Sequence, residues 1–122
     1  MSGIWNRSYS ISHDSGRIAL VGKVPGSGDP TDTNGISYRK IGNIVHVYIV
    51  LGGATAIKVG TSQKIVAMLP KDCHPGTNFF AAGWCPGDPT NQIDVWFFHD
   101  GGIGLKATKE TMYVRSYACF AV

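Results

Sequence analysis

Residues 37–51 read Ser-Tyr-Arg-Lys-Ile-Gly-Asn-Ile-Val-His-Val-Tyr-Ile-Val-Leu and predict a β-hairpin. Two runs rich in β-branched and aromatic residues flank Gly42-Asn43, a pair that suits the positive φ angles of a two-residue type I′ or II′ turn. Every second residue of the later run is apolar, namely Val45, Val47, Ile49 and Leu51. One face of that strand should therefore meet a core, and the mixed face is available to a partner.

The composition extends this prediction to the rest of the chain. The 122 residues are enough for one domain with its own core. Sixteen glycines and six prolines separate short apolar runs, and no ten-residue window has helical periodicity. About eight to ten short strands are typical of a sandwich, a jelly roll or a small barrel. Of these we expect an all-β, antiparallel β-sandwich that is jelly-roll-like.

A possible internal boundary lies at residues 25–35. They read Pro-Gly-Ser-Gly-Asp-Pro-Thr-Asp-Thr-Asn-Gly, which contains only loop-forming residues and no apolar side chain to bury. We therefore divide the chain into an N-terminal arm or strand with its linker, residues 1–35, and a compact β-sandwich domain, residues 36–122.

A second strong strand is predicted at residues 91–99, after a turn at residues 86–90. Its alternate positions differ, with Ile93, Val95 and Phe97 on one face and Asp94, Trp96 and Phe98 on the other. Residues 99–103 have the Asp and Gly chemistry of a hairpin turn. Residues 13–18 are similar in sequence, so the same chemistry predicts a reversal there as well.

Charge and cysteine content exclude several classes. The net charge of +3 comes from thinly spread Lys and Arg residues, so nucleic acid is not an expected partner. Three cysteines cannot form a dense disulfide framework, and the pairing of Cys73 with Cys85 is left open. No apolar run approaches the roughly 20 residues of a membrane helix, and the first residues do not resemble a signal peptide. We expect no membrane insertion, and synthesis in a bacterial cytoplasm is compatible with these features.

Several short motifs recur in an order that resembles a known family. They are Tyr38-Arg39-Lys40-Ile41-Gly42-Asn43-Ile44-Val45, then Met68-Leu69-Pro70, then His74-Pro75, then a closing Ser116-Tyr117. Over residues 36–117, about two thirds of the chain, this order resembles the C-terminal tip domains of bacteriophage tail fibre, baseplate and minor tail proteins. The resemblance implies a β-sandwich that assembles as a homotrimer at the tail tip of a virion and binds a host cell-surface saccharide or protein.

The chain departs from that family at its end. The family usually stops soon after its terminal tyrosine with a polar residue, whereas residues 118–122 continue apolar. That tail should be buried in the domain or in a subunit interface. Because the loops of such domains vary, the resemblance transfers no binding residue.

The acidic and histidine residues do not predict an active site. Most of the eight acids lie in turn-forming contexts where Asp serves the backbone, and the four histidines lack the spacing of metal ligands. We therefore predict that the chain is not an enzyme and needs no metal or other cofactor. His46, in the middle of a strand, could lie on a threefold axis and hold an ion or water there, or it could be a packed imidazole.

A saccharide site needs an aromatic platform beside planar polar groups. Trp84 precedes a loop rich in such groups, so we predict a saccharide-binding set of Trp84, Asp88 and Asn91, with Trp84 packed in the core as the alternative. Large aromatic patches seldom face water in a monomer. We therefore assign Asp94, Trp96 and Phe98 to the subunit interface, together with His46 for its possible place on a threefold axis.

Together these expectations describe a non-enzymatic, trimeric receptor-binding domain of a phage tail tip. One alternative is a purely structural domain that trimerises or caps a fibre and binds no ligand. Another is a small depolymerase module that cleaves a host polysaccharide.

Overall fold

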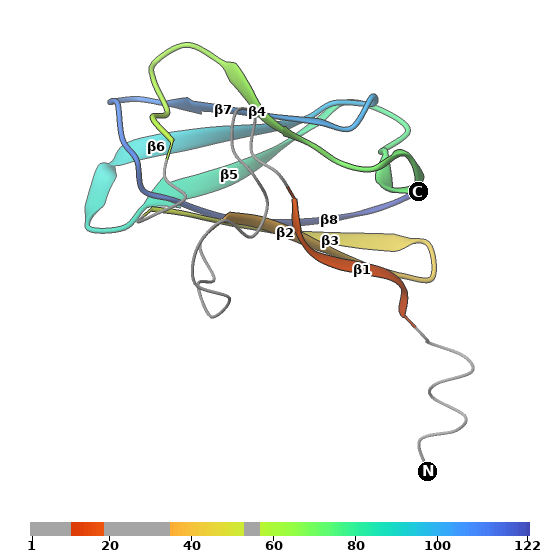
Figure 1. Ribbon diagram of the computed structural model, residues 1–122. Coiled ribbons are helices and arrows are strands. Elements are labelled where there is room, and N and C mark those ends of the chain that lie inside the picture. Colours follow the sequence, from red (N-terminus) through yellow and green to blue (C-terminus); the bar gives the residue numbers. More distant parts are fainter. Residues whose placement is uncertain (1–10, 19–34, 53–56) are drawn as a thin grey trace.

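A computed structural model describes residues 11–18, 35–52 and 57–122 of the chain. In these residues eight strands form one sheet with the order β1-β2-β3-β8-β5-β6-β7-β4, and every neighbouring pair is antiparallel (Figure 1). The elements are β1 (Ile11–Ile18), β2 (Gly35–Ile41), β3 (Ile44–Leu51), β4 (Lys64–Met68), a 3₁₀ turn η2 (Lys71–Cys73), β5 (Phe79–Cys85), β6 (Asp88–Phe97), β7 (Gly102–Ala107) and β8 (Val114–Ala121).

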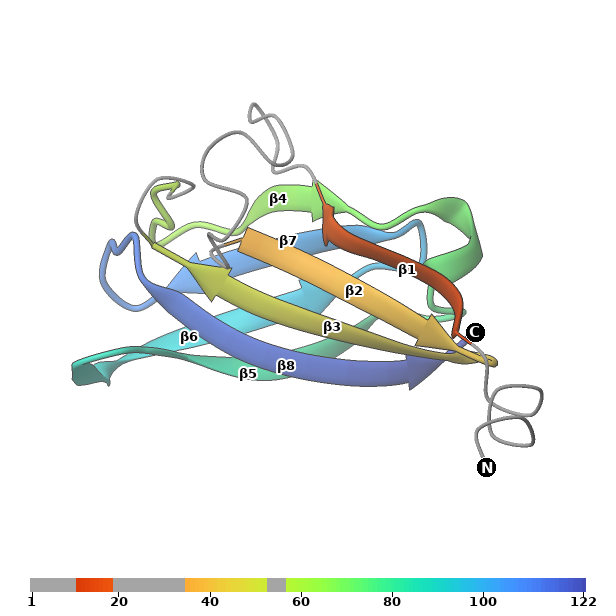
Figure 2. The ribbon, with the colours of Figure 1, turned by 60° about the horizontal axis from the view of Figure 1, so that its bottom comes forward.

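The sheet curls so that two groups of strands face each other. Figures 1 and 2 show β2, β3 and β8 in one layer, while β5, β6, β7 and β4 make up the other. Strand β8 joins the two, because it pairs along its length with β3 but with β5 only through Gly83↔Ser116 and Trp84↔Arg115. A Cβ on Gly83 would lie 3.0 Å from the backbone oxygen of Arg115 and 3.2 Å from Cβ of Ile93. Glycine therefore lets the backbones approach closely where the sheet bends.

The all-β, antiparallel fold that the sequence predicted is confirmed. The jelly-roll-like sandwich is not confirmed, because the strands belong to a single curled sheet and not to two separate ones. Within the three described ranges no helix is long and apolar enough to cross a membrane.

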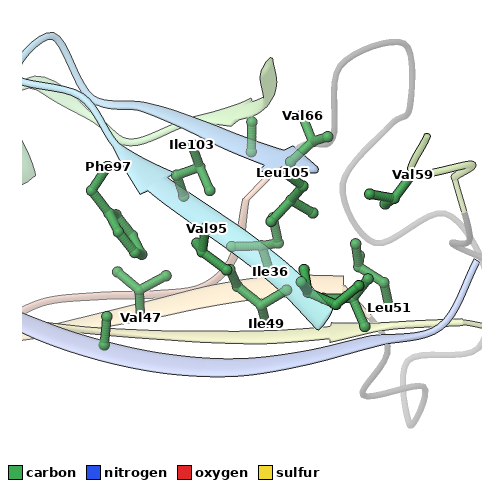
Figure 3. Close-up of a cluster of buried hydrophobic side chains, with 14 of the residues drawn as sticks. Ile36, Val47, Ile49, Leu51, Val59, Val66, Val95, Phe97, Ile103 and Leu105 are labelled. Carbon is green, nitrogen blue, oxygen red and sulfur yellow. The ribbon is translucent and has the colours of Figure 1, made fainter. Parts of the chain in front are cut away.

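The core fills the space between the two layers (Figure 3). The residues that the sequence placed on the inner face of β3 are at most 1% exposed, and Ile93, Val95 and Phe97 of β6 are at most 2% exposed. Burying each such side chain contributes roughly 1.5–3 kcal/mol. At one end of the core the Phe97 ring stacks on Phe79 at 4.9 Å, and Phe120 packs edge-on to Phe79 at 5.4 Å. The apolar tail is thus partly buried within the domain through Phe120.

The hairpin predicted at residues 37–51 is confirmed. Ile41 pairs with Ile44 around a two-residue turn, in which Gly42 has a φ of +60° and Asn43 has no positive φ. These signs are those of the type II′ turn. The turn fixes the register that places Ile36 and Tyr38 of β2 opposite Ile49 and Val47.

One predicted turn is wrong, and another is shorter than predicted. Residues 13–16 lie inside β1, where register shifts against β2 fall between Ile11 and His13 and between Asp14 and Gly16. Asp and Gly chemistry there accompanies a bulged strand and not a reversal. The turn expected at residues 86–90 is shorter, because Cys85 already pairs with Asp88 and β6 begins three residues earlier than predicted. Gly87, with a φ of +80°, lets the chain reverse within two residues.

Strand β1 is hydrogen-bonded to β2, so part of the predicted N-terminal arm belongs to the same sheet. Most of the predicted linker, residues 25–34, lies outside the described residues. The boundary between residues 35 and 36 stays a prediction.

Candidate functional site

The outer face of β5 and β6 carries three large aromatic side chains. The strand register places Phe80 opposite Trp96, Ala82 opposite Asp94, and Trp84 opposite Gln92. Phe80 is 74% exposed and Trp84 is 57% exposed, while Trp96 is half-buried. The Phe80 and Trp96 rings meet edge to face, with centroids 5.7 Å apart and an interplanar angle of 86°. This geometry is favourable for aromatic pairs.

Beside this pair lies a hollow of about 310 Å³ that is lined by Phe80, Ala81, Asp94 and Trp96. We call it the Trp96 hollow. The Asp94 side chain is exposed, and within the described part of the chain it makes no hydrogen bond or ion pair. Lys106 of β7 stands directly opposite Asp94 in the sheet and is also exposed. The hollow therefore combines two rings with a carboxylate free to accept hydrogen bonds, and a lysine stands opposite that carboxylate on the next strand.

Of the predicted saccharide-binding residues, Trp84 is on the surface and does not pack in the core. Asp88 is held by its own turn: its Oδ1 accepts hydrogen bonds from the Thr90 hydroxyl at 2.7 Å and the Thr90 N–H at 3.2 Å. The Lys109 ammonium lies 3.1 Å from Asp88 Oδ2. The Thr90 hydroxyl, and then Lys109, lower the pKa of Asp88 below its ordinary value.

Asn91 is buried and fully engaged by the backbone of Lys109. Its Nδ2 donates to the Lys109 carbonyl at 2.8 Å, and its Oδ1 accepts from the Lys109 N–H at 2.9 Å. Asp88 and Asn91 thus hold the segment after β7 against the start of β6. The amide of Asn91 shapes this loop, and Trp84 is the exposed member of the predicted set.

A second aromatic surface lies on the outer face of β3 and β8. His46 Nδ1 and the Tyr117 hydroxyl share a hydrogen bond of 2.7 Å, and their rings stack with centroids 6.0 Å apart. Tyr48 lies directly opposite Tyr117 in the sheet, with ring centroids 5.1 Å apart. The two tyrosines are 44% and 47% exposed, and Cys119, opposite His46, is also exposed. We call these four residues the tyrosine surface.

The environment of the tyrosine surface affects its ionisation. Partial loss of solvent raises the pKa of Tyr117, and the neighbouring Cys119 thiol raises it further. Near neutral pH the Tyr117 hydroxyl is therefore protonated.

The residues predicted at the subunit interface lie in separate places. His46 belongs to the tyrosine surface, whereas Asp94 and Trp96 line the Trp96 hollow, with β8 and β5 between them in the sheet. Phe98 lies over β7, where a Cβ on Gly104 would be only 3.2 Å from its Cε2 atom. The glycine therefore leaves room for the Phe98 ring. These four residues therefore do not form one continuous patch on a single protomer. Their role in an interface stays a prediction.

The cysteines and Lys40, which could be reactive, have contacts that explain them as parts of the fold. The three cysteines are free, so Cys73 and Cys85 are not joined. Burial, and then the neighbouring Asp72, raise the pKa of Cys73 to about 11. Lys40 reaches from β2 to η2, with its Nζ donating to the Asp72 carbonyl at 3.0 Å. No group of three or more His, Cys, Asp or Glu side chains in the described ranges could hold a metal ion.

Phe80 and Tyr117 were not selected from the sequence as functional residues. Phe80 follows another phenylalanine in an apolar run, which gives no sign that one ring faces outward. The turn at Pro86-Gly87 does not by itself give the pairing of Phe80 with Trp96, because the register shifts between Cys85 and Trp84.

A comparison with models of known protein families finds no match to this chain, and a comparison with curated proteins finds no similar sequence.

Proposed function

We propose that this chain is a non-enzymatic receptor-binding domain of a phage tail tip, or of a phage-derived particle, that recognises a host cell-surface saccharide as a homotrimer. The observation that carries the proposal is the outer face of β5 and β6, where the rings of Phe80 and Trp96 stand beside the Asp94 carboxylate, which makes no hydrogen bond or ion pair to any residue that the structure describes. Exposed rings of this size beside hydrogen-bonding groups are well suited to the apolar face and hydroxyls of a sugar.

The trimer is supported by the tyrosine surface. Its polar groups bond to one another, so a sister subunit could cover His46 and Tyr117 without leaving this pair unsatisfied. Tyrosine is enriched in protein interfaces because one side chain provides both apolar area and a hydroxyl. In the trimer three weak sugar sites would act together, and avidity would raise the affinity for a cell surface.

The fold is compatible with the resemblance to tail-tip domains, with one difference in detail. Such domains are expected to be jelly-roll-like sandwiches, and here the proposed equivalent is a curled sheet with two facing layers and a common core. The facing layers leave their outer surfaces to partners, as the two sheets of a sandwich do.

A purely structural trimerisation or capping domain is the second possibility, and the tyrosine surface alone would serve it. A depolymerase is less well supported. Asp72, Asp88, Asp100 and Glu110 each contact a different partner, respectively Lys40, Thr90 with Lys109, the Gly102 N–H, and Lys58. None of these four contacts places two carboxylates together as a hydrolase requires.

Two measurements on the intact protein test the proposal. Multi-angle light scattering should give three times the mass of one chain, and a glycan array should show binding to saccharides of bacterial surfaces. A trimer without any glycan binding would favour the structural alternative. Release of reducing ends from a bound polysaccharide would favour the depolymerase, and a monomer would contradict the proposed assembly.

A further inference from the structure

We infer that the Trp96 hollow is the saccharide subsite, and that it takes a neutral hexopyranose. The inference rests on the proposed function and adds the location of the site and the charge class of the sugar. Nothing in the sequence singled out this hollow, because Trp96 and Asp94 were expected in a subunit interface and Phe80 was not selected at all.

The two rings provide the shape. Phe80 and Trp96 are nearly perpendicular, at 86°, so one ring can form the floor of the hollow while the other forms a wall. A pyranose has one predominantly apolar face, which can lie on the floor while its edge meets the wall. Both rings come from paired strands and not from loops, so the site is largely preformed.

The size fits a single sugar unit. Small-molecule sites in proteins have volumes of about 300–1,000 Å³, and the hollow, at about 310 Å³, lies at the lower end of that range. A longer saccharide would place one residue in the hollow and extend its neighbours along the exposed face.

The charges select a neutral sugar. The Asp94 carboxylate, which lacks a partner in the described residues, can accept hydrogen bonds from two adjacent hydroxyls and repels the carboxylate of an acidic sugar. Lys106 is the facing charge on β7, the strand next to Asp94, and it repels the ammonium of an amino sugar. On β5 the residue opposite Asp94 is Ala82, which adds no charge. Because Asp94 and Lys106 carry opposite charges, each charged sugar is attracted by one of them and repelled by the other. A neutral hexose is thus the favoured class, since it binds without the cost of removing a charge from water.

Trp84 is the matched comparison within the same hairpin. It is exposed like Phe80, but its neighbours in the sheet are Gln92 and Arg115, and it does not line the hollow. Arg115 is itself engaged, with its Nη1 donating to the Leu51 carbonyl at 2.8 Å. Replacing Trp84 therefore removes an indole ring from the same face, as replacing Trp96 does, but leaves the lining of the hollow unchanged.

The test is an NMR titration of the intact protein with the methyl glycosides of glucose, galactose and mannose, and with glucosamine and glucuronate. We expect at least one neutral glycoside to bind, more tightly than either charged sugar, with a dissociation constant of about 1 mM. Trp96→Ala should weaken binding about tenfold or more, Asp94→Asn about tenfold, and Trp84→Ala less than about twofold.

Each other outcome contradicts a different statement. Tighter binding of glucuronate or glucosamine overturns the charge class. Binding that is lost in Trp84→Ala but kept in Trp96→Ala overturns the location and leaves the proposed function standing. If the intact protein binds no sugar here and none on the array, the proposed function fails as well. If Trp96→Ala lowers the mass measured by light scattering while remaining folded, the ring serves a subunit contact, and the inference is wrong.

Discussion

The tyrosine surface and the Trp96 hollow are both aromatic, and they differ in how their polar groups are satisfied. On the tyrosine surface His46 bonds to Tyr117, and the rings lie against one another. In the hollow the rings stand perpendicular, and the Asp94 carboxylate has no partner among the described residues. A self-satisfied surface suits burial against a like surface, whereas an unsatisfied acceptor suits a ligand that donates hydrogen bonds. Exposure of aromatic area alone does not separate these two roles.

Removing the support that both surfaces share should have the largest effect. Phe97 is 1% exposed and stacks on Phe79 in the core between the two layers. We expect Phe97→Ala to lower the free energy of unfolding by about 3–5 kcal/mol, measured by urea denaturation. Phe80→Ala is the control, because its ring is 74% exposed, and it should cost much less. Equal losses in the two variants would contradict the assignment of inner and outer faces.

The junction between the two surfaces gives the next largest effect. Gly83→Ala would place a Cβ 3.0 Å from the Arg115 carbonyl oxygen, which belongs to the backbone and cannot turn aside. We expect a loss of about 1–3 kcal/mol in the free energy of unfolding. Gly76→Ala is the matched control, because nothing lies within 4 Å of its Cβ position. An unchanged stability in Gly83→Ala would mean that β8 and β5 are not joined as described.

A smaller effect should distinguish the tyrosines from each other. Tyr117→Phe removes the hydrogen bond to His46 and keeps the ring, so we expect a loss of about 0.5–1 kcal/mol. Tyr48→Phe, for which no hydrogen bond to His46 is present, should be nearly neutral. A double-mutant cycle with His46→Ala measures the pair directly. A coupling energy of zero would contradict the view that this surface satisfies its own polar groups.

The rates of thiol labelling should differ between Cys119 on the tyrosine surface and Cys73 in the core. Because the thiolate is the reactive form, a pKa of about 11 keeps Cys73 protonated and unreactive at pH 8, and the side chain is also buried. Cys119 is exposed and should react first in the native protein. Cys119→Ser should abolish the fast phase, and a fast phase that persists in this variant would contradict the burial of Cys73 and Cys85.

The sign of this pKa shift also predicts a dependence of stability on pH. The pKa of Cys73 is higher in the folded protein than the ordinary thiol value. The contribution of Cys73 to the free energy of unfolding is therefore complete below pH 9 and is lost as the pH rises toward 11. Stability should therefore fall over this alkaline range, and Cys73→Ala should reduce that fall.

Alternation and turn chemistry predicted the parts of the fold that are local. The apolar positions of β3 and β6 are buried as expected, and Gly42-Asn43 forms the predicted turn. The connection of β8 to both β3 and β5 could not be predicted, because pairing between distant strands leaves no local pattern. Turn chemistry also failed at Asp14 to Gly16, where the same residue types accompany a bulge.

The candidate site was less predictable than the fold for a related reason. The sequence identified Trp84, Asp94 and Trp96 as notable, but their roles depend on which residues lie opposite them. Asn91, with its amide bound on both sides by Lys109, could not be recognised as structural from a loop context alone. Phe80 acquires its importance only from the register that places it beside Trp96.

The central claim is best tested by following the tryptophan indole N–H signals by NMR while a bound glycan is added. The chain has three tryptophans, and the variants of Trp84 and Trp96 assign two of the signals. The account predicts that the Trp96 signal shifts and saturates with the ligand while the Trp84 signal stays in place. A saturating shift of Trp84 with Trp96 unmoved would contradict it.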